Sequence, residues 1–241
     1  MKTFAVLIMA AGESRRFSDP FTKKPFALLD NRPVWMHSAE RFLKRPEVKQ
    51  VILVVSPDDR ETFLRKFGAN IAFLELELAD GGKERFHSVE NGLKKIQKEI
   101  DFVAVHDAAR PCISELWIDN VFEAAIQHGA AILAAPITGT IKRAKKAGKN
   151  GKETYWVEET VSREHLWEAQ TPQVFRKALL EKAYAERAGF PATDDAQLVQ
   201  RIGQEIQIVP CDRMNIKITT KADIKLAERI LPALPKPAIG F

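Results

Sequence analysis

The stretch FAVLIMAAG, from Phe4 to Gly12, indicates the fold class of this sequence. It is an apolar run that ends in the small residues Ala10, Ala11 and Gly12, and such runs are typical of strands buried on both faces of a parallel sheet. Only Lys2 precedes the run and charged residues follow it at once, which argues against the core of a signal peptide. Small residues at the end of a strand let a ligand approach the backbone closely.

Apolar runs and helical patterns alternate in the sequence that follows. Further strands are expected over 48–56, 71–77, 102–107 and 130–136, and helices over 33–44, 58–67, 85–97 and 114–127. Ser114 can cap the last of these helices and Gly129 can end it. The alternation predicts an α/β fold, a Rossmann-like domain whose mostly parallel sheet is covered by helices on both faces. Because no internal repeat or Pro/Gly-rich linker divides the chain, we expect a single domain over residues 1–241.

Two stretches interrupt this alternation. Between Gly12 and Pro33 lies a loop of roughly twenty residues, and βα connections of that length are usually functional or disordered. The second stretch, 136–172, holds two strand-like runs around the turn-rich AGKNGK, and it predicts a projecting β-hairpin arm at about 138–165. The proline-rich end of the chain, about 232–241, is expected to be a flexible tail.

Composition narrows the class of protein and of partner. The 241 residues are 45% hydrophobic, enough to build a substantial core, and their formal net charge of +5 favours an anionic partner such as a nucleotide, a sugar phosphate or a nucleic acid. Cys112 and Cys211 lack the spacing of a metal site or a disulfide framework, so both are interpreted as reduced packing residues. No apolar stretch approaches the length of about 18 residues that spans a bilayer. We expect a soluble, cytoplasmic protein without a membrane partner.

Cationic side chains on the long loop are suited to phosphate chemistry. Arg16 and Lys24 can converge on phosphates and stabilise the charge that develops on a transferring phosphoryl group, although a solvated basic loop is the alternative interpretation. Neither GxxxxGK[ST] nor GxGxxG follows the first strand, which argues against a P-loop kinase and a dinucleotide oxidoreductase. A nucleotide must therefore be held in another way.

Two further expected strands end in motifs of the same kind. In DGGKERFHS, from Asp80 to Ser88, paired glycines allow close backbone approach and Ser88 offers a hydroxyl, unless the segment is an ordinary turn with a helix cap. The strand 102–107 runs into HDAARP, where Asp107 could bind a ribose hydroxyl or help to hold a metal, and Arg110 could grip a phosphate with two hydrogen bonds. His106 is interpreted as a structural residue.

Taken in order, a set of segments resembles the 2-C-methyl-D-erythritol 4-phosphate cytidylyltransferase family of the non-mevalonate isoprenoid pathway. The segments cover nearly the whole chain and are MAAGESRRF, KKPFALLDNRPV, DGGKERFHSV, VHDAARP, ILAAPITGTIKR, WEAQTPQVF, TDDAQLV and NIKITTKADI. The resemblance implies a domain that binds CTP with Mg²⁺, the ion being held mainly by the CTP phosphates. It implies that the phosphate of methylerythritol phosphate attacks the α-phosphorus of CTP and releases pyrophosphate.

The resemblance also implies roles at the matching positions, with no residue assigned as a metal ligand. Arg16 and Lys24 would stabilise the transition state, and Lys217 would bind and place the substrate phosphate. The nucleotide would lie against Ala10, Ala11, Gly12, Gly82, Ser88, Asp107 and Ala108. Arg110 and Thr193 would lie near the substrate.

In the same family the arm embraces a second subunit, so the resemblance implies a homodimer. Thr140 and Arg163 would then reach the substrate phosphate in the partner's active site. Six of the eleven residues from Lys142 to Lys152 are Lys or Arg. We interpret this run as a solvated turn and not as a nucleic-acid-binding surface.

Four residues depart from the usual pattern of the family: Ser14, Phe17, Pro25 and Lys83. Pro25 leaves Lys24 in place but can alter the path of the loop, and Lys83 replaces a common acidic residue near the expected cytosine site. Two other functions stay open. One is a related cytidylyltransferase that acts on ribitol 5-phosphate, which the AAG and DAARP segments disfavour. The other is a basic nucleic-acid-binding protein, which leaves the loop motifs unexplained.

Overall fold

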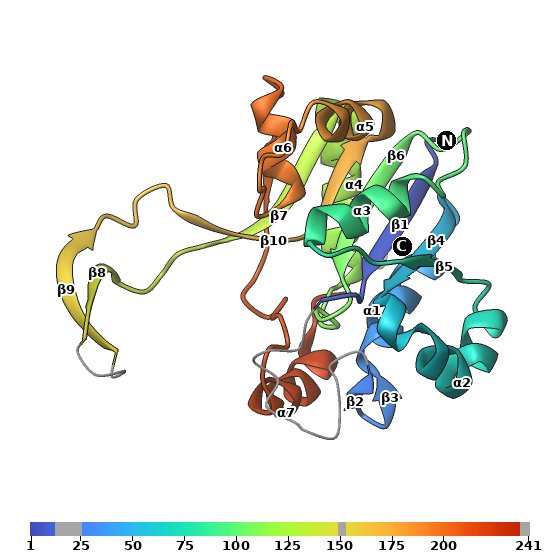
Figure 1. Cartoon of the computed structure of the whole chain (residues 1–241), viewed down its shortest axis with the longest axis horizontal. Coiled ribbons are helices and arrows are strands. Elements are labelled where there is room, and N and C mark those ends of the chain that lie inside the picture. The colour runs from blue at the N-terminus through green and yellow to red at the C-terminus, as the bar shows by residue number, and fades with distance from the viewer. Residues whose placement is uncertain (13–25, 149–152, 237–241) are drawn as a thin grey trace.

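A seven-stranded sheet forms the centre of the computed structural model, which describes residues 1–12, 26–148 and 153–236 (Figure 1). Its strand order is β11-β7-β10-β6-β1-β4-β5. The strands are β1 (Phe4–Met9), β4 (Val48–Val55), β5 (Glu77–Asp80), β6 (Phe102–Asp107), β7 (Ala130–Pro136), β10 (Trp167–Arg176) and β11 (Gln207–Pro210). Neighbouring strands are parallel except where β10 pairs with β6 and β7. The predicted mostly parallel sheet is confirmed, with β10 as an antiparallel strand that we did not predict.

Helices cover both faces of this sheet, as predicted. They are α1 (Val34–Leu43), α2 (Pro57–Phe73), α3 (Arg85–Leu93), α4 (Glu115–His128), α5 (Lys177–Ala185), α6 (Asp195–Arg201) and α7 (Lys221–Ile230). Alternate residues of β1 belong to two separate cores: Val6 and Ile8 pack with residues of α1, α2, α4 and α7. Ala5 and Leu7 pack with residues of α3, α5 and α6. The first strand is therefore buried on both sides, which explains its unbroken apolar run.

Both ends of α4 follow the predicted signals. The Ser114 side chain accepts a hydrogen bond from the Trp117 backbone N–H at 3.2 Å, and this satisfies one of the free donors at the start of the helix. Gly129 ends the helix with φ of 84°, in the left-handed region that favours glycine. Both assignments are confirmed.

The strand expected over 71–77 is wrong. Helix α2 continues to Phe73, and β5 begins only at Glu77. The alternating residues 74–78 suggested a strand, but Phe63, Phe67 and Ile71 are spaced four residues apart and place one apolar stripe against the core. The helical spacing prevails because it buries these larger side chains.

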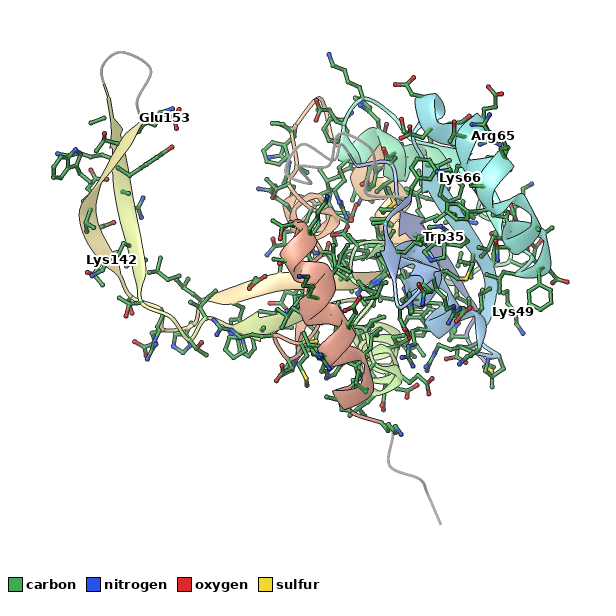
Figure 2. The ribbon with its side chains drawn as sticks, turned by 90° about the horizontal axis from the view of Figure 1, so that it is seen from below. Trp35, Lys49, Arg65, Lys66, Lys142 and Glu153 are labelled. Atoms are coloured by element: carbon green, nitrogen blue, oxygen red, sulfur yellow. The ribbon has the colours of Figure 1, made fainter. Side chains whose placement is uncertain are left out.

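The predicted arm is a hairpin of β8 (Ile141–Ala147) and β9 (Thr154–Val161), which pair antiparallel in a sheet of their own. It extends away from the body of the molecule in both views (Figures 1 and 2). Strands β7 and β10 carry the chain to it, pairing as far as Pro136 and Trp167.

The two other predicted irregular segments contain some regular structure. Within the expected loop between Gly12 and Pro33, β2 (Leu28–Leu29) and β3 (Arg32–Pro33) form a small antiparallel pair. Near the end of the chain, the 3-10 helix η2 (Leu231–Ala233) follows α7, and Leu234 is buried. Residues 13–25, 149–152 and 237–241 lie outside the described residues.

Candidate active site

Backbone from three segments meets at the carboxyl edge of the sheet. The N–H groups of Ala10 and Gly81 donate to the last two carbonyls of β4, at 2.8 and 2.7 Å, and the Ala108 N–H donates to the last carbonyl of β1 at 3.1 Å. These bonds extend the sheet past the ends of its strands. The segments that hold the predicted residues Ala10, Ala11, Gly82 and Ala108 are therefore brought side by side.

The two glycines after β5 are required by close packing. A Cβ atom on Gly81 would lie 2.3 Å from the Cβ of Ala11, and one on Gly82 would lie 2.3 Å from the Cβ of His87. The Gly82 N–H donates to the buried Ser88 Oγ at 3.0 Å. Ser88 thus holds the turn in shape, which agrees with the structural interpretation of this segment and leaves a wall of backbone at the site. Gly81 belongs to the paired glycines noted in the sequence, but the family resemblance gives it no role.

Asp107 lies at the end of β6 among three cations. Lys217 Nζ is 2.5 Å from its Oδ2, Arg110 Nε is 4.0 Å from the same oxygen, and Arg85 Nε is 4.0 Å from Oδ1. Burial alone would raise the pKa of Asp107, but the charges of Lys217, Arg85 and Arg110 outweigh it and hold that pKa well below its usual range. Asp107 is therefore an oriented carboxylate.

The segment after β11 completes this cluster. Arg110 is buried, and its Nη1 donates to the backbone carbonyl of Asn215 at 2.7 Å. The Ile218 N–H donates to the carbonyl of Ala109 at 2.7 Å, which places the intervening Lys217 next to Asp107. Among the described residues, nothing forms a hydrogen bond with Arg110 Nε. The predicted residues Asp107, Ala108, Arg110 and Lys217 thus lie together.

His106 has a structural position, as interpreted from the sequence. Its Nε2 lies 3.1 Å from the carbonyl of Arg110, and its Nδ1 lies 3.2 Å from Thr171 Oγ1. Complete burial lowers the pKa of His106 to about 4, so the ring is neutral at physiological pH. It holds the loop after β6 in shape.

A second layer behind Asp107 escaped the sequence analysis. The buried carboxylate of Asp195, the first residue of α6, accepts hydrogen bonds from Arg85 Nη2 at 2.7 Å and from the Tyr184 hydroxyl at 2.6 Å. The motifs DGGKERFHSV and TDDAQLV contain Arg85 and Asp195, but 110 residues separate the two and no sequence spacing joins them. Thr193 lies exposed just before α6 and bonds through its N–H and hydroxyl to Gln197 Oε1.

Among the described residues, Thr140, Arg163 and Gly12 were predicted but are not in this cluster. Thr140 and Arg163 lie exposed on the arm, where Arg163 Nη1 donates to the carbonyl of Thr138. The arm extends away from the body that carries Asp107 (Figure 1). Arg16 and Lys24 lie outside the described residues. Gly12 is exposed, with no neighbouring atom that a Cβ would touch.

Among the described residues we looked for a metal site, a disulfide and a membrane-spanning helix. Within 1–12, 26–148 and 153–236, no group of three or more His, Cys, Asp and Glu side chains could hold a metal ion. Cys112 and Cys211 are free, and burial raises the pKa of each thiol to about 12, which agrees with reduced packing residues. In the same part of the chain, none of the helices combines the length and apolarity needed to cross a bilayer.

Comparison with known proteins gives one consistent result. The sequence profile of the family described as 2-C-methyl-D-erythritol 4-phosphate cytidylyltransferase (IspD) matches residues 4–233. The protein of that name from Bacillus velezensis is 41% identical over 233 residues, which cover 95% of this chain and 96% of its own. The one from Bacillus pumilus is 40% identical over 233 residues, covering 95% of this chain and 97% of its own.

Solved structures agree. The 2-C-methyl-D-erythritol 4-phosphate cytidylyltransferase of Francisella tularensis superposes with a TM-score of 0.74 at 28% identity, covering 95% of this chain and 100% of its own. The 4-diphosphocytidyl-2C-methyl-D-erythritol synthase of Anaerococcus prevotii gives a TM-score of 0.77 at 26% identity, with 96% and 99% coverage. Each of these two similarities covers at least 95% of this chain.

Proposed function

The chain belongs to the 2-C-methyl-D-erythritol 4-phosphate cytidylyltransferase family, and from this premise we propose how its residues share the reaction. It is a nucleotidyltransferase that transfers CMP from CTP to 2-C-methyl-D-erythritol 4-phosphate, giving 4-diphosphocytidyl-2-C-methyl-D-erythritol and pyrophosphate in the non-mevalonate isoprenoid pathway. Ribitol 5-phosphate and nucleic acid lose support, because the family profile and the full-length relatives agree on methylerythritol phosphate.

CTP is proposed to bind along the backbone wall at the carboxyl edge of the sheet. The cytidine would lie against Ala10, Ala11, Gly12 and Gly82 with Ser88, and its ribose would face Asp107 and Ala108. The backbone of Ala10, Gly81 and Ala108 at this edge supports this, because a flat ring can approach backbone that carries small side chains or none. Open α/β sheets bind their ligands at this edge. A pocket of this kind should favour pyrimidine over purine triphosphates.

The observation that carries the proposal is the ion pair of Lys217 with Asp107. Lys217 is 41% exposed whereas Asp107 is 11% exposed at the side chain, so a phosphate can reach the ammonium without opening the core. Lys217 would then give up its ion pair with Asp107 and bind the phosphate of methylerythritol phosphate. Arg110 and Thr193 would lie near the substrate. The buried pair of Arg110 and Asp107 would keep the rest of the site in place.

The transfer itself is a substitution at phosphorus. An oxygen of the substrate phosphate attacks the α-phosphorus of CTP, the bond from that phosphorus to the bridging oxygen of pyrophosphate breaks, and the electron pair leaves with pyrophosphate. Arg16 and Lys24, outside the described residues, are proposed to stabilise the charge that grows on the α-phosphate oxygens. Catalysis then consists mainly of positioning and of electrostatic stabilisation.

Mg²⁺ is proposed as the cofactor, bound mainly through the phosphates of CTP. The Asp107 carboxylate at the edge of the sheet is an oxygen donor of the kind that Mg²⁺ accepts, and it could help to hold such an ion. Proteins commonly bind Mg²⁺ through substrate phosphates with few protein ligands. The ion supplies charge neutralisation on the triphosphate when bound.

We also propose a homodimer built through the arm of a single nucleotidyltransferase domain. Tyr155, Trp156 and Val157 are 61%, 60% and 64% exposed, and a two-stranded hairpin with such side chains gains stability only when something packs on it. A second copy of the chain would cover them. Thr140 and Arg163 would then contact the substrate phosphate bound by the partner's body.

Pyrophosphate release with CTP and each polyol phosphate tests this assignment. Methylerythritol phosphate should support turnover, ribitol 5-phosphate should give a far lower kcat/KM, and ATP or GTP should not replace CTP. Lys217→Ala should raise the KM for methylerythritol phosphate more than that for CTP. Equal kcat/KM for the two polyol phosphates would contradict the substrate assignment, and a nucleic-acid-binding protein would release no pyrophosphate with either.

A further inference from the structure

Asp195 is a buried carboxylate with both oxygens engaged. Its side chain is fully buried, Oδ1 accepts from the Tyr184 hydroxyl at 2.6 Å, and Oδ2 accepts from Arg85 Nη2 at 2.7 Å. A buried charge is costly unless it is paired and hydrogen-bonded, and these two donors meet that requirement. Tyr184 lies on α5, so the carboxylate joins three helices.

Arg85 links this carboxylate to the active site. It is the first residue of α3, and its guanidinium faces acids on two other elements: Asp195 on α6 and Asp107 at the end of β6. Burial acts to lower the pKa of Arg85, but the charges of Asp195 and Asp107 raise it, so the guanidinium stays charged. The planar fork can hold one carboxylate by Nη2 while its Nε side faces the other.

The two oxygens of Asp107 therefore have different partners. Oδ1 faces Arg85, whose partner Asp195 is buried, and Oδ2 faces Lys217 and Arg110. Lys217 is the most exposed member of this set, at 41% against 29% for Arg85 and 8% for Arg110, and it is the residue that the proposed function assigns to the substrate phosphate. When Lys217 leaves, Arg85 keeps the charge of Asp107 compensated from the protein side.

We propose that Asp195, assisted by Tyr184, is a positioning residue for the transfer reaction. It fixes Arg85 so that the guanidinium stays facing Asp107 Oδ1, 4.0 Å away, and its charge keeps Asp107 oriented toward the nucleotide while Lys217 binds substrate. This inference rests on the proposed roles of Asp107 and Lys217. It differs from a purely structural role, in which the Arg85–Asp195 pair only ties α3 to α6.

A double-mutant cycle separates the two roles. The affinity for CTP is measured by titration calorimetry in the full-length protein, with Asp195→Asn made alone and in an Asp107→Asn background. Asp195→Asn should weaken CTP binding about fivefold or more in the first case and less than about twofold in the second, because the residue acts through Asp107. A structural role would change the affinity by the same factor in both backgrounds, and that result would overturn the proposal.

Kinetics and matched variants complete the test. Asp194→Asn neutralises the neighbouring carboxylate, which bonds to Gln173 and caps α6 without contacting Arg85, and it should leave kcat/KM within about twofold of wild type. Tyr184→Phe removes the hydroxyl that donates to Asp195, and it should lower kcat/KM a few-fold. If Asp195→Asn does not fold, Tyr184→Phe takes its place in the double-mutant cycle with Asp107→Asn. Unchanged kcat/KM in both Asp195→Asn and Tyr184→Phe would reject the positioning role. Absence of methylerythritol phosphate turnover by the wild type would instead reject the proposed function.

Discussion

Lys217 and Asp107 form an ion pair in which one partner is accessible and the other is not. The ammonium is partly exposed, whereas the carboxylate is nearly buried and has Arg85 and Arg110 as further cations. A phosphate that displaces the carboxylate from Lys217 therefore leaves Asp107 still compensated. This arrangement fits the proposed role of Lys217, because the exposed cation can change partner while the other two cations keep the carboxylate compensated.

Arg16 and Lys24 are assigned to charge that grows only in the transition state. Arg16→Ala and Lys24→Ala should each lower kcat about a hundredfold or more while weakening CTP binding much less. Steady-state kinetics and CTP titration measure the two effects. Lys49→Ala is the matched control, because this exposed lysine lies on β4 near its amino end and away from the carboxyl edge (Figure 2). An unchanged kcat in both loop variants would refute the assignment.

His106 should make stability depend on pH. Its pKa is lowered to about 4 in the folded protein from 6.5, so the unfolded chain binds the extra proton between these values and stability falls as pH falls through this window. With about 1.4 kcal/mol per pKa unit, the loss between pH 7 and pH 5 is about 2 kcal/mol.

Urea unfolding at pH 7 and at pH 5 measures the loss of unfolding free energy in wild type and in His106→Gln. The variant is expected to be less stable at pH 7, because it loses buried hydrogen bonds, but to have a flatter pH dependence. If the unfolding free energy changed with pH to the same extent in both proteins, His106 would not be the source of the pH dependence. Burial also lowers the pKa of His37, and this contribution is the same in both proteins, whereas the lowered pKa values of Asp101 and Asp223 act at lower pH.

Among the elements, the strands β1, β4, β6 and β7 and the helices α1, α3 and α4 could be predicted because each buries its own apolar pattern, whereas β11, α5, α6 and α7 were not among the expected elements. Strand β10 could not be predicted, because Pro172 lacks the N–H that a central strand normally donates, and the pairing with β7 shifts register between Ala169 and Gln173. The predicted edge motifs came together because parallel strands end at one edge. The bond from Arg85 to Asp195 depends instead on how α6 docks beside α3, which no local pattern encodes.

The turn between β5 and α3 gives a prediction for a single methyl group. Gly81→Ala would bring a Cβ to within 2.3 Å of the Ala11 Cβ, so we expect a shift of the backbone wall, weaker CTP binding and a loss of stability of about 1–3 kcal/mol.

Gly68→Ala in α2 is the control for that variant. A Cβ there meets no atom within 4 Å, and the substitution should stabilise the helix by about 0.5–1 kcal/mol. Thermal unfolding and CTP titration of both variants test the pair. Equal effects on CTP binding would show that the contact of Gly81 with Ala11 does not shape the site.

In the whole molecule, the body and the arm differ in how much of their side chains they bury. The body buries two apolar cores, whereas nearly all side chains of β8 and β9 are exposed. Cross-strand pairs such as Arg143 with Glu159 hold the arm's own geometry but do not cover its apolar side chains. The body in turn contains Asp107 and Lys217 but neither Thr140 nor Arg163. In a dimer whose arms each pack on the other subunit, the apolar side chains of the arm would be covered. Thr140 and Arg163 would then be brought to the body that contains Asp107 and Lys217.

Exchange of arms predicts complementation between two inactive variants. Arg163→Ala removes the arm's contribution and Lys24→Ala removes the body's contribution, so each homodimer should have almost no activity. In a mixed dimer, the Lys24→Ala subunit supplies an intact arm to the partner, whose body still has its own Lys24. One of the two sites is then complete, and the heterodimer should recover about half of wild-type activity. Co-expression with two different affinity tags isolates the heterodimer, and native mass spectrometry verifies its composition. A pure heterodimer without activity would mean that Arg163 acts within its own subunit or takes no part in the reaction.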